Sequence, residues 1–381
     1  LIRQRKVTLS GRTRWLGGTE TASRRESSQF NCSFKNFKTV HDGVDLLWLL
    51  LQGCGVGARP VIGILNGFSR PIDEVEVIRS ELTMEDWEAG HRASPDNEET
   101  FHDGVWTIKI GDSAEAWAKA LGKLLAGKFP ARKLVLDLRR IRPAGVRLKG
   151  YGWISSGDAK IAIAFPAIAK ILSQQAGKLL TRINLLDIFN WMAEILTSRR
   201  AAELGLLEWQ SPEWEEFALA KRDYWATGNN HRRLSNNTIL FNSKPTRRQL
   251  KSFIDMMIAG GGSDPGLANG VEALRRASYF SGFNPCVTSD TWILTREGPR
   301  QVSQLLDAPF DAIVHGRPYQ ATAFWSTGTK QTVKITTDRG YEIRLTPDHK
   351  LLVEKGRAAK RETVDGSRRL AGWDVATEWV E

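Results

Sequence analysis

Leu134-Val135-Leu136-Asp137-Leu138 is a short apolar run that predicts a buried strand, and the segments around it decide the fold class. A helical pattern precedes it at residues 113–126. Its apolar side is formed by Trp117, Leu121, Leu124 and Leu125. Elements of both kinds follow, with helices predicted at 159–175 and 182–197 and strands at Glu203–Trp209 and Thr238–Phe241. Strands that alternate with helices favour an α/β fold with parallel strand pairing.

The remaining upstream segments give weaker signals. Residues 1–29 are polar and basic and predict an irregular lead-in. The apolar run at 44–51 predicts a helix that ends in a glycine-rich turn, Gln52–Gly57. Residues 69–103 are acidic and predict loops. A last helix is expected at 246–259, before the loop signal Gly260-Gly261-Gly262-Ser263-Asp264-Pro265-Gly266.

The pattern of apolar residues in the sequence changes at Cys286. Helical periodicity stops, and short β-rich runs follow, which are Thr291–Thr295, Ala312–Val314, Thr332–Thr336 and Tyr341–Thr346. Asp338-Arg339-Gly340 predicts a turn between the last two runs. We therefore expect a lead-in at 1–29, an α/β domain at 30–285 and an all-β segment at 286–381.

Composition limits the compartment. The chain of 381 residues is 41% hydrophobic and 25% charged, which is typical of globular domains. No apolar run has the ~20 residues that a membrane span needs, and the basic start Leu-Ile-Arg-Gln-Arg-Lys resembles no secretory leader. Three cysteines are too few for a secreted disulfide scaffold, so a reducing cytoplasm is the expected location. Because the chain does not begin with Met, we expect it to start inside a longer one.

The basic charge is unevenly distributed. Net charge is +11, and residues 286–381 contain only 14 basic against 13 acidic residues, so nearly all of the excess lies upstream. This excess could serve polyphosphate ligands or nucleic acid, or it could be a diffusely basic surface. The chain has no compact Lys/Arg run and no basic stripe with interleaved aromatic residues, so its sequence does not favour a protein that recognises a specific nucleic-acid sequence.

Six motifs upstream of Cys286 resemble, in their order and spacing, one enzyme family. They are Phe30-Asn31-Cys32-Ser33-Phe34, Gly53-Cys54-Gly55-Val56-Gly57, Leu136-Asp137-Leu138 with Ile141-Arg142-Pro143, Ser198–Leu204, Ser235-Asn236-Asn237 and Asn284-Pro285-Cys286. Together they are most similar to the monomeric, adenosylcobalamin-dependent (class II) ribonucleoside-triphosphate reductases. The resemblance covers roughly residues 15–286.

The reductase resemblance implies a fold and a radical mechanism. The family fold is a ten-stranded α/β barrel, of which this chain would contain the amino-terminal half. Cys286 matches the finger-loop cysteine that becomes a thiyl radical and takes hydrogen from the ribose 3′ carbon. Cys32 matches one of two thiols that reduce the 2′ position and end as a disulfide, and Asn284 would hydrogen-bond the ribose hydroxyls.

The same resemblance implies ligands and partners. Ser155, Ser156 and Gly157 match the substrate-side loop, and Asn236 and Asn237 are further candidates for substrate binding. Adenosylcobalamin is the implied cofactor, with a di-iron-dependent relative as the alternative. A ribonucleoside triphosphate, a nucleotide effector and a thioredoxin-like reductant are the implied partners. No metal ligands are expected.

Some positions depart from the reductase pattern or have a plainer explanation. Thr288 stands where the family has glutamate, and no cysteine follows Cys286 to act as the second redox thiol. Cys54 is expected to pack beneath the glycine turn, and Arg199 and Arg200 could be structural ion-pair residues.

From Cys286 onward the sequence resembles the first splicing blocks of an intein. Cys286–Thr295 resembles the opening block, and Gly340–Leu352 resembles the second block, with its Thr-x-x-His. The implied fold is the all-β Hint domain. In that mechanism the Cys286 thiol attacks the preceding carbonyl, His349 protonates the departing amide nitrogen, and Thr346 orients that amide.

The terminal splicing blocks do not follow, which leaves alternatives open. The chain could be a truncated gene product or the amino-terminal half of a split intein with a separate carboxy-terminal fragment as its partner. It could also be a self-processing Hint protein whose upstream domain is only a carrier. We expect the 381-residue chain to reduce no nucleotide by itself, because half a barrel leaves a strand edge exposed.

Overall fold

The computed structural model describes residues 18–29, 32–91, 94–148, 154–196, 202–260, 264–276, 278–282, 292–306, 308–314, 317–321, 333–336, 342–345, 351–362 and 368–380. The chain divides into two compact units. One is Gly18–Phe324, and the other joins Leu1–Gly17 to Trp325–Glu381. None of the described helices combines the length and the apolar character needed to cross a bilayer.

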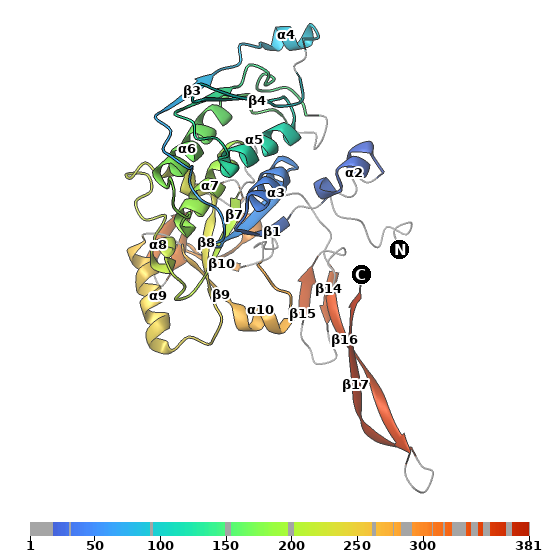
Figure 1. Cartoon of the computed structure of the whole chain (residues 1–381). Helices are drawn as coiled ribbons and strands as arrows, with labels where there is room; N and C mark the ends of the chain where they lie inside the picture. The colour runs from blue at the N-terminus through green and yellow to red at the C-terminus, as the bar shows by residue number, and fades with distance from the viewer. Residues whose placement is uncertain are drawn as a thin grey trace. The chain divides into compact units, whose positions relative to one another are not determined.

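A five-stranded sheet organises the larger unit (Figure 1). Its order is β1-β2-β7-β8-β9, and every neighbouring pair is parallel. The strands are β1 (Cys32–Phe37), β2 (Gly55–Pro60), β7 (Ala202–Glu208), β8 (Asn236–Phe241) and β9 (Gly266–Asn269). The prediction of an α/β fold with parallel pairing is confirmed.

Five helices match the helical segments predicted from the sequence, and they are α3 (Val40–Leu51), α5 (Ala114–Ala126), α6 (Ile161–Gln174), α7 (Arg182–Glu194) and α9 (Arg247–Ala259). The described part of this unit also contains α8 (Trp214–Ala218) and α10 (Gly270–Arg276). Side chains cap several of them: Thr39, Thr181 and Thr246 each form a capping box at a helix start. Where the sequence predicts an irregular lead-in, the short helix α2 (Glu20–Arg24) and the 3-10 helix η1 (Glu26–Gln29) open the described chain.

A second sheet lies between α3 and α6 in the sequence, with strand order β3-β6-β5-β4. It contains β3 (Glu74–Ile78), β4 (Glu98–His102), β5 (Val105–Lys109) and the predicted strand β6 (Lys133–Asp137), and α4 (Met84–Glu88) follows β3. The prediction of loops over 69–103 is therefore wrong. The charged residues of β3 point outward: Lys133 in β6 lies 2.8 Å from Glu74 and 2.7 Å from Glu76. Acidic composition thus hid a strand whose exposed glutamates pair with a lysine on the neighbouring strand.

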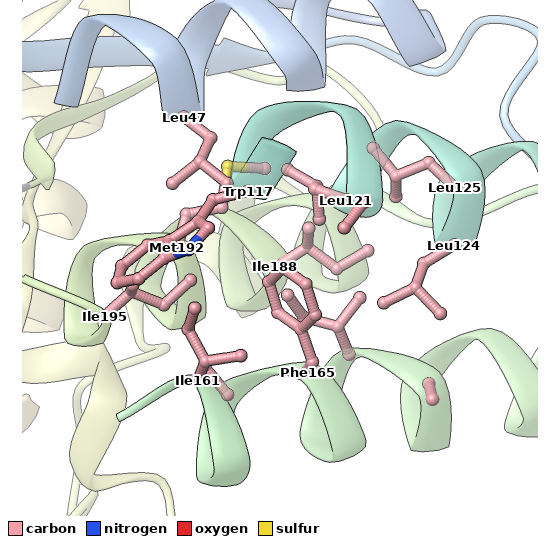
Figure 2. Packing of buried hydrophobic residues seen from close by; sticks show 14 of the residues in the cluster. Leu47, Trp117, Leu121, Leu124, Leu125, Ile161, Phe165, Ile188, Met192 and Ile195 are labelled. Carbon is pink, nitrogen blue, oxygen red and sulfur yellow. The ribbon is translucent and has the colours of Figure 1, made fainter. Parts of the chain in front are cut away.

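One core joins the two sheets. In Figure 1 the helices α3, α5, α6 and α7 lie between the β3–β4 strands and the five-stranded sheet. Figure 2 shows Leu47 of α3, Trp117 of α5 and Phe165 of α6 converging in this layer. The same buried cluster extends to Trp106 in the second sheet and Val56 in the first. Each sheet therefore depends on the same helix layer for burial of its apolar face.

Helices α3 and α5 cross at two glycines. A methyl group built on Gly43 would lie 2.5 Å from Cδ1 of Leu125, and one on Gly122 would lie 2.7 Å from Cγ2 of Val44. Both distances are shorter than carbon atoms tolerate. Glycine at these two positions is therefore what allows the helices to approach so closely.

The glycine-rich motif after α3 is mainly a strand. Only Gln52 and Gly53 turn the chain, with φ +81° at Gly53, whereas Gly55–Pro60 forms β2 and is almost entirely buried. The prediction of a turn over 52–57 is wrong beyond Gly53. Neighbouring strands on both sides make an extended backbone favourable here in spite of the glycine content.

Beyond residue 291 nearly all described elements are strands. The last described part of the larger unit in the sequence is a four-stranded antiparallel sheet with strand order β11-β10-β12-β13. It comprises β10 (Trp292–Thr295), β11 (Gly298–Gln301), β12 (Phe310–Val314) and β13 (Arg317–Ala321), with the short 3-10 helix η3 (Val302–Gln304). The other unit has two antiparallel pairs, β14 (Val333–Thr336) with β15 (Glu342–Leu345) and β16 (Leu351–Glu362) with β17 (Arg368–Val380). The four predicted β-rich runs are confirmed. The Hint fold stays a prediction, and the turn predicted at 338–340 lies outside the described residues.

Candidate functional site

The two faces of the five-stranded sheet have different partners. Leu207, Ile239 and Phe241 pack with Phe217 of α8 and Phe253 of α9. Leu206 and Leu240 point the other way and pack with Phe34 and Phe280. Because side chains alternate along a strand, this second surface carries the even-numbered residues of β1, β7 and β8. We call it the Phe34 face.

Cys32 begins β1 and belongs to the Phe34 face, two residues before Phe34. Its side chain is exposed and is not part of a disulfide. The neighbouring strand pairs Gly55 with Cys32 and Gly57 with Phe34. Glycines inside a strand often mark a place where a ligand or another backbone approaches closely. The thiol therefore lies beside a surface without side chains on the adjacent strand.

The chain that leads to Cys286 crosses this same face. The backbone of Gly282 lies so close to Phe34 that a methyl group there would overlap the Phe34 ring. Phe280, two residues earlier, packs in the cluster on this face. Phe34 is two residues from Cys32, or about 7 Å along the strand. Asn284 and Cys286 lie outside the described residues, but the segment immediately before them is adjacent to the Cys32 strand.

The two candidate asparagines of β8 point in opposite directions. Asn236 is exposed and lies on the Phe34 face, in register with Leu204 of β7. Asn237 is buried on the other face, where its Oδ1 accepts a hydrogen bond from Ser235 Oγ at 3.0 Å. Asn237 Oδ1 is also next to Gly205, on the side that packs against α7 and α8. Only Asn236 therefore shares a surface with Cys32.

Hydrogen bonds within the chain hold the Ser155–Gly157 loop. Gly157 donates its backbone N–H to Ser155 Oγ at 3.0 Å, and the Ser155 N–H donates to the carbonyl of Val146 at 2.7 Å. Gly157 has φ +65°, and a methyl group there would lie 2.8 Å from the backbone nitrogen of Ala144. Glycine is thus required at 157 both for its dihedral angle and for space. Ser156 is half-buried, and its hydroxyl lies 3.4 Å from the carbonyl of Gly157.

Asp158 anchors this loop to strand β3. Arg79 donates two hydrogen bonds to its carboxylate, at 2.6 and 3.0 Å, and the Ser80 N–H donates a third at 2.8 Å. Burial opposes the charge of Asp158, but the hydrogen bonds from Arg79 and Ser80 hold its pKa below the usual range. Asp158 therefore links the loop to the end of β3.

A polar cluster on the Phe34 face was not predicted from the sequence. Arg59 in β2 donates to Glu208 at 2.7 Å and to Asn36 at 3.0 Å. These residues end three neighbouring strands, at the opposite end of the face from Cys32. The register of β1 with β2 brings Asn36 beside Arg59. The cluster could not be predicted from the sequence, because the pairing of these strands was not known.

Other candidate residues are placed or lie outside the described parts. Cys54 is buried on the helix-facing side, with Sγ 3.5 Å from the Ser27 carbonyl, as expected for a packing residue. Thr346, His349, Arg199 and Arg200 lie outside the described residues. Within the described ranges, no group of three or more His, Cys, Asp and Glu side chains is arranged to hold a metal ion.

Comparisons with known proteins show which proteins the chain is similar to. No family model matches the chain. It is 27% identical, over 74% of its length, to the adenosylcobalamin-dependent ribonucleoside-triphosphate reductase of Lactobacillus acidophilus, and covers 42% of that protein. It is 28% identical, over 73% of its length, to the reductase of the same name from Lacticaseibacillus paracasei, of which it again covers 42%. The chain thus spans less than half the length of these relatives.

A solved structure supports the fold. A B-12-dependent (class II) ribonucleotide reductase superposes with a TM-score of 0.53 over 82% of this chain and 45% of its own, at 21% identity. The mixed α/β architecture with parallel sheets therefore matches the barrel fold of class II ribonucleotide reductases. The comparisons leave the intein resemblance untested.

Proposed function

We propose that this chain is the amino-terminal part of an adenosylcobalamin-dependent ribonucleoside-triphosphate reductase, interrupted at Cys286 by the first part of an intein. The observation that carries the reductase proposal is the contact of Gly282 with Phe34. It brings the segment before Asn284-Pro285-Cys286 onto the sheet face that begins with Cys32. The named relatives support the same conclusion independently.

The proposed chemistry needs sulfur at two positions. A thiyl radical at the position of Cys286, held after splicing by the host cysteine that takes its place, takes the hydrogen atom from the ribose 3′ carbon and later returns it. Cys32 and a second thiol, outside this chain, together supply two hydrogen atoms and become a disulfide, while the 2′ hydroxyl leaves as water. Asn284 would hold the ribose hydroxyls, and Asn236 is the candidate on β8 that lies on the Phe34 face. A thioredoxin-like protein would then reduce the disulfide.

The cofactor proposal is compatible with the residues present. Adenosylcobalamin would supply the first radical when bound. Gly55 and Gly57 pair with Cys32 and Phe34, so the strand next to Cys32 adds no side chain to the face where substrate and radical would meet. The triphosphate substrate and a nucleotide effector belong to the same proposal, as does the Ser155–Gly157 loop as its substrate-side element.

The intein proposal concerns the same Cys286. Its thiolate would attack the carbonyl of residue 285, forming a thioester as the peptide C–N bond breaks. His349 would give a proton to the departing nitrogen, and Thr346 would orient the amide. The antiparallel strands beyond residue 291 are compatible with a Hint domain. In the spliced product a host cysteine would occupy the radical position.

The deciding experiment uses the intact parent protein, assembled from this chain and the coding sequence that follows it. We expect deoxynucleotide formation that depends on adenosylcobalamin. Cys32→Ser should abolish it, and the matched change Cys54→Ala should leave it in place, because Cys54 is buried on the opposite face. An intact protein that splices but reduces no nucleotide would instead favour a Hint protein with a carrier domain.

A further inference from the structure

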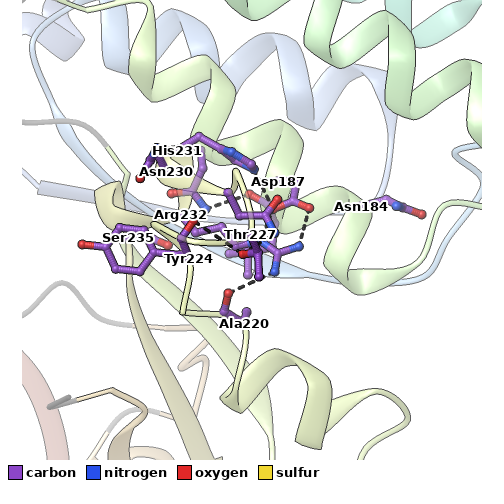
Figure 3. A network of polar contacts seen from close by, with 12 residues as sticks. Asn184, Asp187, Ala220, Tyr224, Thr227, Asn230, His231, Arg232 and Ser235 are labelled. Atoms are coloured by element: carbon purple, nitrogen blue, oxygen red, sulfur yellow. Dashed lines mark hydrogen bonds and ion pairs between the residues drawn. The ribbon is translucent and has the colours of Figure 1, made fainter. Parts of the chain in front are cut away.

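A buried polar network joins helix α7 to the segment that leads into β8 (Figure 3). Arg232 donates two hydrogen bonds to the Asp187 carboxylate, from Nε at 2.6 Å and from Nη2 at 2.7 Å. His231 Nε2 lies 2.9 Å from the same carboxylate. An ionised carboxylate only accepts hydrogen bonds, so His231 must carry its proton on Nε2. Three donors from η2 (Asn230–Leu234) therefore converge on one side chain of α7.

Asp187 is charged in spite of its burial. Loss of water opposes its ionisation, but the hydrogen bonds from Arg232 and His231, together with the Arg232 charge, hold its pKa below the usual range. The ring of His231 also stacks on Trp191, one helical turn further along α7, at 4.4 Å between ring centroids. Both the direction and the rotation of η2 are thereby fixed against the helix.

The ends of the segment are held as well. Arg232 Nη1 donates to the carbonyl of Ala220 at 3.0 Å, and Lys221 Nζ donates to the carbonyl of Ser235 at 3.0 Å. Lys221 also forms an ion pair with Asp264, just before β9. The residue that precedes Asn236 therefore has its position set by side chains from outside the strand.

The position of Ser235 determines what β8 presents to each side. Asn236 is in register with Leu204 and lies on the Phe34 face, while Asn237 points toward α7. A slip of one residue would exchange the two asparagines, because side chains alternate along a strand. We infer that Asp187 and Arg232 are positioning residues that keep Asn236 on the Phe34 face, the same sheet face that carries Cys32 two strands beyond β7. The functional part of this inference rests on the proposed reductase activity.

Adjacent arginines provide a matched test. Arg232 belongs to the buried network, whereas Arg233 is half exposed and pairs with Glu194 at 2.9 Å. In the 381-residue chain, Arg232→Gln should speed hydrogen exchange of the amides of 236–241 at least tenfold. Arg233→Gln should leave it within about twofold, because exposed ion pairs contribute little. Equal exchange in the two variants would overturn the structural part of the inference.

A double-mutant cycle in the intact reductase tests the action through Asn236. Arg232→Gln should lower kcat at least tenfold in the native background and have little effect once Asn236→Ala is present, since it would act through that side chain. A loss of the same size in both backgrounds would mean that Arg232 serves the fold alone, and would overturn the positioning role. Absence of reductase activity in the native protein would reject the proposed function, while the exchange result would still stand.

Discussion

The contact between Gly282 and Phe34 can be tested by a deliberate clash and its relief. Gly282→Ala places a methyl group inside the Phe34 ring, and overpacking of this kind costs about 1–3 kcal/mol. Phe34→Ala removes a half-buried ring and should cost about 2 kcal/mol, less than the 3–5 kcal/mol of a fully buried one. In the double variant the methyl group occupies space that the ring has left. The double variant should therefore lose about 2 kcal/mol, and not the sum of about 4 kcal/mol.

Urea denaturation followed by fluorescence of the 14 tryptophans measures this cycle in the whole chain. A coupling of about 2 kcal/mol exceeds the scatter of ~0.5 kcal/mol seen between independent sites. Phe129 gives a matched control, because its ring stacks on Phe101 in the second sheet, away from Gly282. Gly282→Ala should be additive with Phe129→Ala. Additivity with Phe34→Ala as well would mean that the segment before Cys286 does not lie on the Phe34 face, and the main support for the proposed site would be lost.

Three further predictions concern Cys286 and Asp187. Excess dithiothreitol should release residues 1–285, seen by intact mass, and Cys286→Ala should prevent it; release from the alanine variant would exclude the thioester route. Asp187→Asn should destabilise the chain by roughly 3–5 kcal/mol at pH 7, measured by urea denaturation, because Arg232 is left buried without its counterion. The folded pKa of Asp187 is lowered, so its stabilisation is full above its unfolded pKa of ~3.9 and is lost as pH falls through the folded value. The native chain should thus lose more stability than Asp187→Asn on acidification below about pH 4, and parallel pH profiles would contradict the charged pair.

Periodic segments were predicted well because their burial pattern is visible in the sequence itself. Helices α5, α6, α7 and α9 lie within a few residues of their predicted ranges. Strands β3 and β4 were missed because acidic residues on their exposed sides resemble loop composition. Strand β2 was mistaken for a turn because glycines usually indicate a turn. Here Gly55 and Gly57 are extended and pair with Cys32 and Phe34 of β1. In each case the missing information was the identity of the partner strand.

The candidate site was only partly accessible from the sequence. Motif order led to the prediction of Cys32 as a site residue. The sequence treated Asn236 and Asn237 as equivalent candidates, and the alternation of side chains along β8 separates them. The ion pair of Arg59 with Glu208 joins residues 149 positions apart, so only the folded sheet brings it to notice. The same is true of the Asp187 network, whose members come from α7 and from the approach to β8.

The glycine crossing of α3 and α5 has a consequence for how such a chain can change over time. Strands β3 to β6 and helix α5 are consecutive in the sequence. They therefore resemble a single insertion that evolution could add or delete as one segment. Gly43 and Gly122, however, allow α5 to approach α3 until Val44 and Leu125 fill the remaining space. Excision would leave a groove along α3, and a bulkier residue at either glycine would force the helices apart. The second sheet is therefore structurally required in this fold. Its loss would require new residues on α3 to cover the surface that α5 leaves exposed.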